Sequence, residues 1–542
     1  MFRTTPAELE QTLFDLVVIG GGITGVATAR DAALRGLSVL VVEKDDFAAG
    51  TSSRSSKLIH GGLRYLQTYQ FGLVAESLRE RERMLNLAPH LTEVHPFLYL
   101  LYRGYPETKL LLNLGLTFYD VASGQWRKRR HKMLSAPEVS KVEPYLRTEG
   151  LVGAGRYYDV LTDDARLTVD TAKGAAEAGA RLLNHAAVVE LILEGGQARG
   201  VVVADQFTGQ NHRIHARQVL NATGPWTDRT LSLEHGGEPA TKLRPTKGVH
   251  IVLRKSDFPL NTAVFLRSPD DNRVVWPTPS LESDVVYVGT TDTDYAGDPD
   301  RVQPTEADVK YLLNVANHTI PSAQLTEQHI VGSWAGLRPL VASAPGSSTS
   351  NASREHAITT GPTGMLTISG GKLTSNRVMA KQLVDAAVKK LRVRTRSYAA
   401  GATPISGGVP FDESAIRRAA KLAGVPDEVS GTWVRRYGAN AEKLVALWLE
   451  DESARVVVGP RGLTVAEILF GVREELAGSL EDLLVRRTSV FFWDADGGLK
   501  QIEAIADVFV AELNWSDERR QREIEGYTRL VRAHRPGGFV RE

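Results

Sequence analysis

The chain has 542 residues, which is too many for one hydrophobic core, so we expect two or three domains. Its 65 basic and 64 acidic residues leave a net charge of +1, which argues against bulk binding of nucleic acid. It contains no cysteine, which excludes disulfides, cysteine-ligated iron–sulfur clusters, thiol catalysis and flavin attached through sulfur.

The N-terminal region does not resemble a signal peptide. Its first apolar run begins only at Leu13, and it lacks a basic start and a small-residue cleavage site. No run in the chain approaches the roughly 18 to 20 apolar residues that a membrane span needs. We therefore expect a protein of the cytoplasm or of a membrane surface.

A strand, a helix and a second strand are predicted at the start of the chain. Residues 15–20, DLVVIG, are largely apolar and β-branched, which is typical of a strand buried on both faces. A helical pattern covers residues 24–35, and Gly36 is placed to end it. Residues 37–43, LSVLVVE, predict a second buried strand, so the whole region is interpreted as a βαβ unit.

Further elements are predicted along the rest of the chain. Residues 399–410 are rich in glycine, alanine and proline and indicate a linker, beyond which the pattern becomes helical and charged. Strands are expected at 187–193, 200–204, 218–221, 250–253, 285–288 and 365–368, and helices at 168–178 and 373–390.

The glycines after the first strand predict a dinucleotide site. Gly20, Gly22 and Gly25 have the G-x-G-x-x-G spacing, which gives a tight turn, close backbone approach to a pyrophosphate and close helix–strand packing. The helix N-terminus would meet the phosphates. Glu43 ends the second strand, where a carboxylate binds ribose hydroxyls. The alternative is a glycine-rich turn in an unrelated α/β protein.

The polar stretch SSKLIHGGLRYL, residues 55–66, favours FAD over NAD, because a flavin ring lies far from the adenine and needs a long loop of hydroxyls and bare backbone. The hydroxyls of Ser52, Ser53, Ser55 and Ser56 can donate to phosphates or ribityl oxygens, and the Gly61–Gly62 pair can lie against the ring. The alternative is an ordinary turn.

Two later strand ends also carry glycines. They are QVLNATGPW at 218–226 and ISGGKLTSNR at 368–377, and the second opens a helix whose N-terminus can face the flavin end of the cofactor. Together the pieces indicate one flavin domain that is split by insertions.

These motifs resemble the FAD-dependent glycerol-3-phosphate dehydrogenase family, within the flavoproteins similar to D-amino-acid oxidase. The matching stretches run in the family's order from residue 15 to residue 377 and include SSKLIHGGLRYL, NATGPW, KGVHIVL, GTTD, GLRPL and GGKLT. EDLLVRRT at 481–488 resembles the C-terminal helical domain of the family.

The resemblance implies an α/β (overall α+β) fold, with a Rossmann-like FAD-binding domain of the D-amino-acid-oxidase/glutathione-reductase type. It implies a discontinuous FAD domain at 12–90, 150–235 and 345–398. An inserted antiparallel-sheet substrate domain is expected at 91–149 and 236–344. A helical domain at 411–542 follows the linker at 399–410.

The resemblance also implies that sn-glycerol 3-phosphate is oxidised to dihydroxyacetone phosphate. Hydride would pass from C2 to non-covalent FAD and electrons then to membrane quinone, in a homodimer on the inner face of the cell membrane. The implied cofactor residues are Gly20, Gly22, Ile23, Thr24, Gly25, Glu43, Lys44, Thr51, Ser52, Ser53, Ser55, Ser56, Lys57, Leu58, His60, Gly61, Gly62, Val188, Ala222, Thr223, Gly224, Trp226, Gly370, Gly371, Lys372, Leu373 and Thr374.

A phosphate-bearing alcohol needs cations for its phosphate. Arg64 offers a charged fork and Tyr65 a hydroxyl, and Lys372 follows a glycine pair at a helix start. Arg354 matches a family position near the substrate, and Thr291 would be a hydroxyl contact.

The reaction also needs a proton acceptor near the C2 hydroxyl. His250 is the leading candidate, because the pKa of histidine suits proton removal near neutral pH, and His60 is the rival. Arg338 matches another family position near the substrate and is expected to act electrostatically, because a guanidinium hardly deprotonates. No metal is expected.

Residues 95–132 combine apolar and aromatic runs with the basic cluster WRKRRHK at 126–132. Such a segment can dock on an anionic membrane. Equally, its apolar part can be a core helix and the cluster a solvated loop.

Three other functions remain open. A glycerol-3-phosphate oxidase, which passes electrons to oxygen, would share almost every motif. An amine- or amino-acid-oxidising relative would not need so many cations, and a non-catalytic flavin-bound scaffold would bind FAD without reducing it. No calcium-binding loop follows residue 399, so no calcium regulation is expected.

Overall fold

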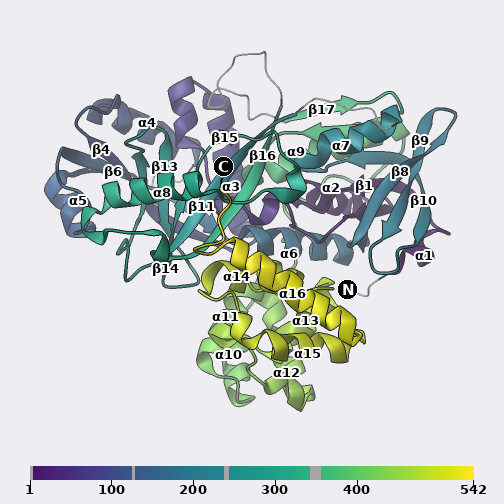
Figure 1. The fold of residues 1–542 in the computed structure, drawn as a ribbon. Coiled ribbons are helices and arrows are strands. Elements are labelled where there is room, and N and C mark those ends of the chain that lie inside the picture. The colour runs from purple at the N-terminus through teal and green to yellow at the C-terminus, as the bar shows by residue number, and fades with distance from the viewer. Residues whose placement is uncertain (1–3, 125–128, 237–242, 342–355, 542) are drawn as a thin grey trace.

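The computed structural model describes residues 4–124, 129–236, 243–341 and 356–541 (Figure 1). Its first sheet is built around β1 (Leu13–Ile19), which pairs in parallel with β2 (Val39–Val42) and β10 (Asn211–Asn221). Within the described residues this sheet has eight strands, in the order β17-β18-β10-β1-β2-β7, with β9 on β10 and β8 on β9. Its other strands are β7 (Arg181–Leu183), β8 (Ala186–Glu194), β9 (Gln197–Asp205), β17 (Ala357–Thr360) and β18 (Leu366–Ser369).

Helices cover one face of this sheet. They are α2 (Ile23–Leu34), α6 (Asp164–Glu177) and α9 (Asn376–Leu391), whose apolar side chains share one core with alternate residues of β1 and β2. The opposite residues of β1 and β2 pack against β8 and β9. The strands and helices predicted from the sequence in this part of the chain are therefore confirmed, to within a few residues at their ends except for β10, which begins seven residues before the predicted strand at 218–221.

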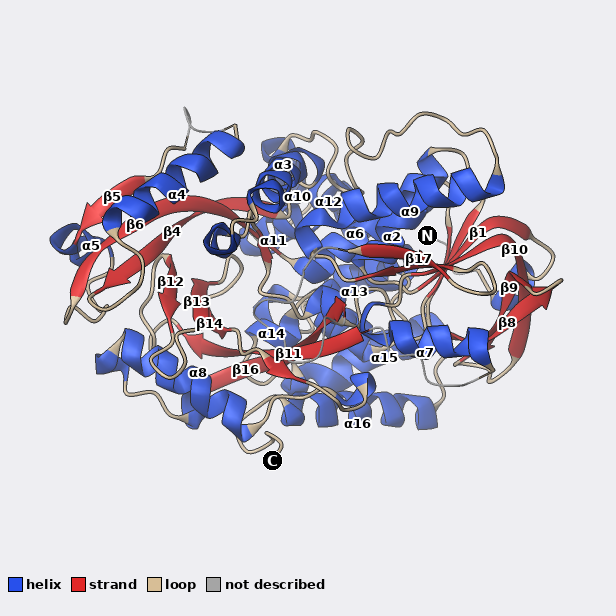
Figure 2. Ribbon diagram, turned by 90° about the horizontal axis from the view of Figure 1, so that it is seen from above, coloured by secondary structure: helices blue, strands red, loops and turns tan. Residues whose placement is uncertain are grey.

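The second sheet has ten strands among the described residues and lies beside the first (Figure 2). Nearly all its pairs are antiparallel, as expected for the inserted part, and only β12 pairs in parallel with β4. Helix α8 (Glu306–Thr319) packs on one face of it, and α3 (Phe71–Leu87) and α4 (Lys109–Ala122) pack on the other. The strands are β3 (Leu58–Ile59), β4 (Thr92–Tyr102), β5 (Lys132–Ser135), β6 (Leu151–Thr162), β11 (Leu243–Arg254), β12 (Ala263–Arg267), β13 (Val274–Pro279), β14 (Val285–Gly289), β15 (Thr293–Asp294) and β16 (Ile330–Val341).

Strand β6 corrects one part of the expected organisation. It falls in the range 150–235 that was grouped with the cofactor domain, but it pairs with β4, β5 and β3 in the second sheet. The periodicity of a segment predicts a strand but not the strands with which it pairs. The sheet to which β6 belongs is therefore known only from the tertiary structure.

The C-terminal helices lie together beneath both sheets (Figure 1). Residues 399–410 contain no helix or strand, yet they are not a free linker. Arg30 donates to the carbonyl oxygens of Thr403 and Pro404 at 2.6 and 2.8 Å, and Ile405 is buried. The helices are α10 (Glu413–Leu422), α11 (Asp427–Tyr437), α12 (Ala441–Glu450), α13 (Val465–Glu475), α14 (Val490–Trp493), α15 (Ile502–Leu513) and α16 (Asp517–Ala533).

The segment at 95–132 divides into two elements with different surroundings. The second half of β4 is core, whereas α4 buries Leu112 and Leu116 and leaves Leu110, Leu111 and Leu114 exposed. Within the described residues, no helix has the length and apolar character to cross a membrane. Residues 125–128 of the basic cluster lie outside the described residues.

We predict that Glu475→Ala weakens the docking of the C-terminal helices. Glu475 accepts two hydrogen bonds from Arg166 at 2.7 and 2.8 Å, and both side chains are fully buried. Removing one partner of a buried ion pair costs about 3 to 5 kcal/mol of unfolding free energy. Urea denaturation followed by tryptophan fluorescence measures the loss.

The matched control is Glu512→Ala, which removes the partner of Arg473 at the surface. An exposed pair contributes at most about 1 kcal/mol. Equal losses in the two variants would show that the buried pair is not the stronger contact.

Candidate functional site

A cavity of about 610 Å³ opens at the carboxyl ends of β1, β2, β10 and β18. This is where open α/β sheets bind ligands. Gly20 lies at its wall with φ +109°, and a Cβ there would come 2.7 Å from the carbonyl oxygen of Ala222. A Cβ at Gly25 would come 1.9 Å from the carbonyl oxygen of Gly20, so Gly25 acts behind the wall, in the packing of α2 on β1.

Glu43 lies at one end of the cavity, directly after β2. Its carboxylate accepts hydrogen bonds from the backbone N–H groups of Gly21 and Asp45, at 2.6 and 2.9 Å. Burial raises the pKa of Glu43 to about 7, against these two hydrogen bonds, which lower it. A partly buried acid in this position is suited to accept hydrogen bonds from ribose hydroxyls.

Residues 51–57 form a second wall, which neighbouring elements hold at three points. The Ser52 hydroxyl accepts from the Ile23 N–H at the start of α2, at 2.9 Å, and the Thr51 hydroxyl donates to the Leu337 carbonyl of β16 at 2.6 Å. Ser55 and Lys57 both bind Asp164 of α6, at 2.7 and 2.6 Å. Lys57 is therefore buried in an ion pair and does not reach the cavity that Ser55 lines.

Arg54 is a cavity residue that the sequence analysis missed. Its guanidinium makes no hydrogen bond or ion pair with any of the described residues, and burial lowers its pKa. Arg54 is half-buried, and a partly desolvated cation without a partner is costly, so this position favours an anionic ligand group. The stretch TSSRSSK was interpreted through its serines alone. The arginine between them could have been recognised as a candidate ligand for the phosphates of the cofactor.

The far end of the cavity meets a smaller one of about 90 Å³. Arg64, Arg273 and Arg338 line the smaller cavity, and His60 and Tyr65 line both. The Lys372 ammonium lies 3.8 Å from the centre of the Tyr65 ring. The structure thus brings together four cations and a phenol from four distant parts of the chain.

His250 of β11 lines the main cavity, next to Ser56, which lines both cavities. Its Nε2 is 3.0 Å from the Ser56 hydroxyl, and its ring stacks on Trp334 at 4.8 Å between centroids. Its Nδ1 is buried and has no hydrogen-bond partner among the described residues. Burial, and then the charges of Arg338 and Lys57, hold the pKa of His250 well below its usual range, so the imidazole is neutral near pH 7.

Arg338 of β16 is held in one orientation. It contacts the Asp292 carboxylate at 3.1 Å and donates to the Thr290 hydroxyl at 3.0 Å. Thr291, the predicted hydroxyl contact, instead accepts from the Val249 N–H at 3.0 Å and does not line the cavity. The adjacent Thr290 lines it instead.

Not all of the remaining predicted residues line the main cavity. Gly61 packs against Leu78 and Tyr119 in the core, and Ser53 is buried beside Gly50, so neither lines the main cavity. Gly62 lines the smaller cavity, and Arg354 lies outside the described residues. Other residues that the sequence analysis assigned to the cofactor line the main cavity. They are Gly22, Ile23, Thr24, Lys44, Leu58, Val188, Ala222, Thr223, Gly224, Trp226, Gly370, Gly371, Leu373 and Thr374.

The cavity fits an FAD molecule in size and in its polar groups. An acid for ribose stands at one end, and an unpartnered guanidinium and the N-terminus of α2 stand along its wall. Glycine backbone after β18 and a neutral histidine stand at the other end. Such a volume lies within the range of small-molecule and cofactor sites, roughly 300 to 1,000 Å³.

Comparison with known proteins agrees with this site. Residues 15–377 match the model of the FAD dependent oxidoreductase family, and residues 399–520 match that of the C-terminal domain of alpha-glycerophosphate oxidase. The aerobic glycerol-3-phosphate dehydrogenase of Staphylococcus aureus (strain USA300) is 37% identical over 532 residues, covering 96% of this chain and 93% of the relative.

Solved structures extend the likeness to the fold. The glycerol-3-phosphate dehydrogenase from Bacillus halodurans, complexed with FAD, is 32% identical, with a TM-score of 0.82 over 97% of this chain and 96% of that chain. The FAD-bound L-alpha-glycerophosphate oxidase from Mycoplasma pneumoniae is 18% identical, with a TM-score of 0.54 over 74% of this chain and 100% of its own, and shares the fold. With these matches along nearly its whole length, the chain belongs to the FAD-dependent glycerol-3-phosphate dehydrogenase family.

Proposed function

We propose that this FAD-dependent enzyme oxidises sn-glycerol 3-phosphate at C2 to dihydroxyacetone phosphate. The observation that carries the proposal is the small cavity with Arg64, Arg273 and Arg338. It adjoins the FAD cavity at Ser56, whose hydroxyl contacts His250. The named activities of the Staphylococcus and Bacillus relatives support it. When bound, FAD supplies the hydride acceptor.

The cations have the chemistry to bind the phosphate of the substrate. Guanidinium groups bind phosphate oxygens through two parallel hydrogen bonds. Arg64, in the short helix at 63–68, and Arg273, directly before β13, both line the small cavity. Lys372 and Tyr65 stand together at the junction of the two cavities. We propose that these groups hold the phosphate and leave C2 next to His250.

His250 is our proposed proton acceptor. It lines the cavity and is neutral at physiological pH, so its imidazole can take the proton of the C2 hydroxyl as hydride leaves carbon. The phosphate charge would offset nearby cations such as Arg338, which lower the pKa of His250, and so would make the imidazole more basic once substrate binds. His60 lines both cavities and is the alternative acceptor.

Arg338 is proposed to stabilise charge and not to transfer a proton. Its contacts with Asp292 and Thr290 fix the guanidinium before substrate arrives. A preorganised cation next to the oxygen that becomes the carbonyl lowers the energy of the transition state without reorganisation during the reaction.

We further propose that quinone takes the electrons and that α4 docks on the membrane. Leu110, Leu111 and Leu114 are 69%, 58% and 58% exposed on one side of α4. Arg129 and Arg130 are also exposed and follow this helix in the chain. An apolar helix face next to basic residues is typical of interfacial membrane binding. Helix α4 packs on the segment that carries Arg64 and Tyr65, so docking there would bring the site near the membrane. Homodimer assembly stays a prediction.

We predict that sn-glycerol 3-phosphate bleaches the flavin band of the purified protein in the absence of oxygen. The expected cause is hydride transfer within the site described above. Absorbance near the flavin maximum measures it, and dithionite shows the full amplitude. Bleaching by dithionite but not by this substrate would overturn the substrate assignment and turn attention to amines or to a non-catalytic role.

Reoxidation of the bleached protein separates the electron acceptors. If quinone is the acceptor, a soluble quinone analogue restores the flavin colour faster than air-saturated buffer does. Faster recovery with oxygen, accompanied by hydrogen peroxide, would instead identify an oxidase.

We predict that His250→Asn slows flavin reduction by about 10²- to 10⁴-fold, the contribution expected of a general base. Stopped-flow absorbance under anaerobic conditions measures the rate. In the wild type, kcat/KM should fall through protonation of His250 only below pH 6.5, because the pKa of this group is lowered. His60→Asn is the matched comparison, and a greater loss in that variant would make His60 the acceptor.

We predict that the double variant Leu111→Gln/Leu114→Gln loses membrane binding. Two exposed leucines supply apolar area for insertion, so their loss should lower the partition onto vesicles of phosphatidylglycerol and phosphatidylcholine by about tenfold or more. Vesicle co-sedimentation measures it. Leu422→Gln on α10, at a residue 90% exposed, is the control. An equal loss in the control, or none in the double variant, would exclude α4 as the docking face.

A further inference from the structure

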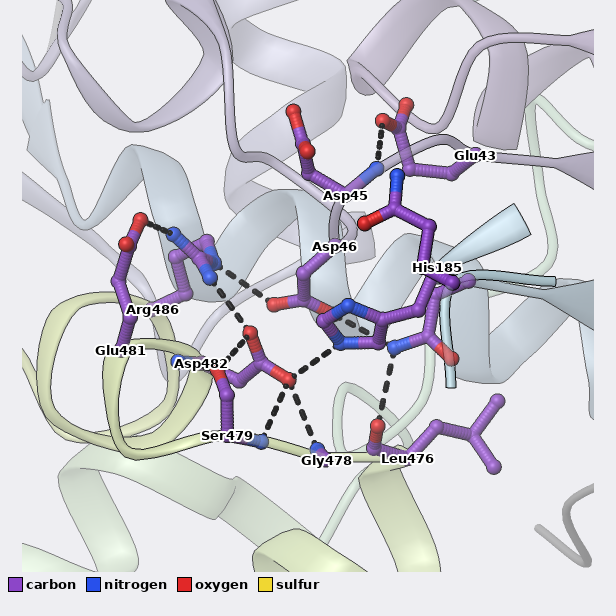
Figure 3. Close-up of polar contacts among 12 residues, drawn as sticks. Glu43, Asp45, Asp46, His185, Leu476, Gly478, Ser479, Glu481, Asp482 and Arg486 are labelled. Atoms are coloured by element: carbon purple, nitrogen blue, oxygen red, sulfur yellow. Dashed lines mark hydrogen bonds and ion pairs between the residues drawn. The ribbon is translucent and has the colours of Figure 1, made fainter. Parts of the chain in front are cut away.

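The loop that carries Glu43 is held by the C-terminal helical domain. Asp46 lies in this loop and is fully buried. Arg487 donates to both of its carboxylate oxygens at 2.7 and 2.8 Å. Arg486 Nε donates to Oδ2 at 2.7 Å (Figure 3). Asn184 adds a hydrogen bond to Oδ1 at 2.9 Å. The two arginines belong to EDLLVRRT, a motif to which the proposed reaction assigns no role.

Asp482 of the C-terminal domain contacts the same loop indirectly, through His185. Its Oδ1 accepts from Arg486 at 2.6 Å, and its Oδ2 accepts from the Gly478 N–H at 2.7 Å and bonds His185 Nε2 at 2.8 Å (Figure 3). The backbone N–H of His185 in turn donates to the Asp45 carbonyl at 2.6 Å. Asp45 therefore donates its backbone N–H to the Glu43 carboxylate, and its carbonyl accepts a hydrogen bond from His185, which contacts Asp482.

The cluster of Asp46, His185 and Asp482 is an ionic contact and not a metal site. Its ligand atoms lie within 4.8 Å of one another, but arginines already occupy both carboxylates. Burial alone would raise the pKa of Asp482, but His185, Arg486 and Arg487 outweigh it and hold that pKa well below its usual range. Two buried acids facing two buried arginines leave no charge for a cation to balance.

The C-terminal domain also contacts the second cofactor loop. The Lys57 ammonium lies 4.4 Å from the centre of the Phe492 ring on α14, and the Ser489 hydroxyl donates to Asp163 at 2.8 Å. Lys57 is next to Ser56, which bonds His250. Neither residues 43–50 nor 54–57 form a helix or strand, so their shape depends on such contacts.

We propose that the C-terminal helical domain is a positioning element for FAD, and that Arg486 and Arg487 hold the 43–46 loop in its binding form through Asp46. Glu43, Lys44 and Asp45 all line the cofactor cavity, so a shift of this loop moves the ribose-binding carboxylate. FAD binding and docking of residues 476–489 are then linked: each stabilises the other by the same free energy. The inference rests on FAD as cofactor and not on the proposed substrate.

The first test compares FAD release from Arg487→Gln and wild-type holoprotein. Free FAD fluoresces more than bound flavin, so dilution of the yellow protein gives the dissociation rate directly. We expect at least tenfold faster release from Arg487→Gln and partial rescue in Arg487→Lys, which keeps the charge but not the paired hydrogen bonds.

The matched control is Lys173→Met. Lys173 is a buried cation at the same domain interface, where it bonds Glu474, but it does not touch the 43–46 loop. Its removal should lower the free energy of unfolding but leave Asp46 held by Arg486 and Arg487, so FAD release should stay within twofold of wild type. Equal release rates in Arg487→Gln and wild type, or equal acceleration in Lys173→Met, would overturn the proposal.

The second test needs no variant and decides the matter if Arg487→Gln does not fold. Hydrogen exchange is compared between the holoprotein and the same protein stripped of FAD. We expect FAD to slow exchange of backbone amides at 476–489 as well as at 20–62. Protection confined to the cofactor domain would overturn the proposal. Neither test uses substrate, so a wrong substrate assignment would not affect either result.

Discussion

The cofactor cavity depends on the close contact between the backbones of β1, β10 and α2 at Gly20 and Gly25. A single methyl group at either glycine would collide with a carbonyl oxygen, at 2.7 Å from Ala222 and 1.9 Å from Gly20. Because these backbones meet, the start of α2 lies directly over the end of the sheet. The helix N-terminus, the Glu43 carboxylate and the Arg54 guanidinium then face one space. That arrangement binds a dinucleotide by backbone and charge together.

Buried charge organises the rest of the molecule around this cavity. Arg166, Arg486 and Arg487 are at most 2% exposed, and each meets at least one buried carboxylate of another segment. Such pairs contribute little net stability compared with an apolar contact, but they are costly to break or to misalign. They therefore define one orientation of the C-terminal helices on the cofactor domain, where an apolar interface alone could slide.

The two ends of the cavity differ in charge, and this difference orients the ligands. An acid stands at the ribose end, and arginines and a lysine stand at the end that opens into the smaller cavity. In the proposed reaction, the phosphate of the substrate is attracted to the cationic end, where the neutral His250 would accept a proton. His250 is neutral because it is buried and near cations, so the proposed phosphate binding and proton transfer would depend on the same charges.

The sequence by itself determined the features that local chemistry encodes. Gly20, Gly22, Gly25 and Glu43 could be assigned because turn geometry and strand periodicity act over a few residues. The buried runs around β1 and β2 and the grouping of motifs into one flavin domain were predicted for the same reason.

Only the tertiary structure decided which distant residues meet. In the structure β6 belongs to the second sheet, and Thr290 lines the cavity in place of Thr291. Arg54 lines the main cavity and Arg273 the smaller one, although neither was predicted. It also joined Asp46 to Arg487 across 441 positions of the chain. Such a pair cannot be predicted from one sequence. Whether a charged residue is buried depends on a partner of opposite charge, and which residue becomes that partner depends on the fold of the whole chain.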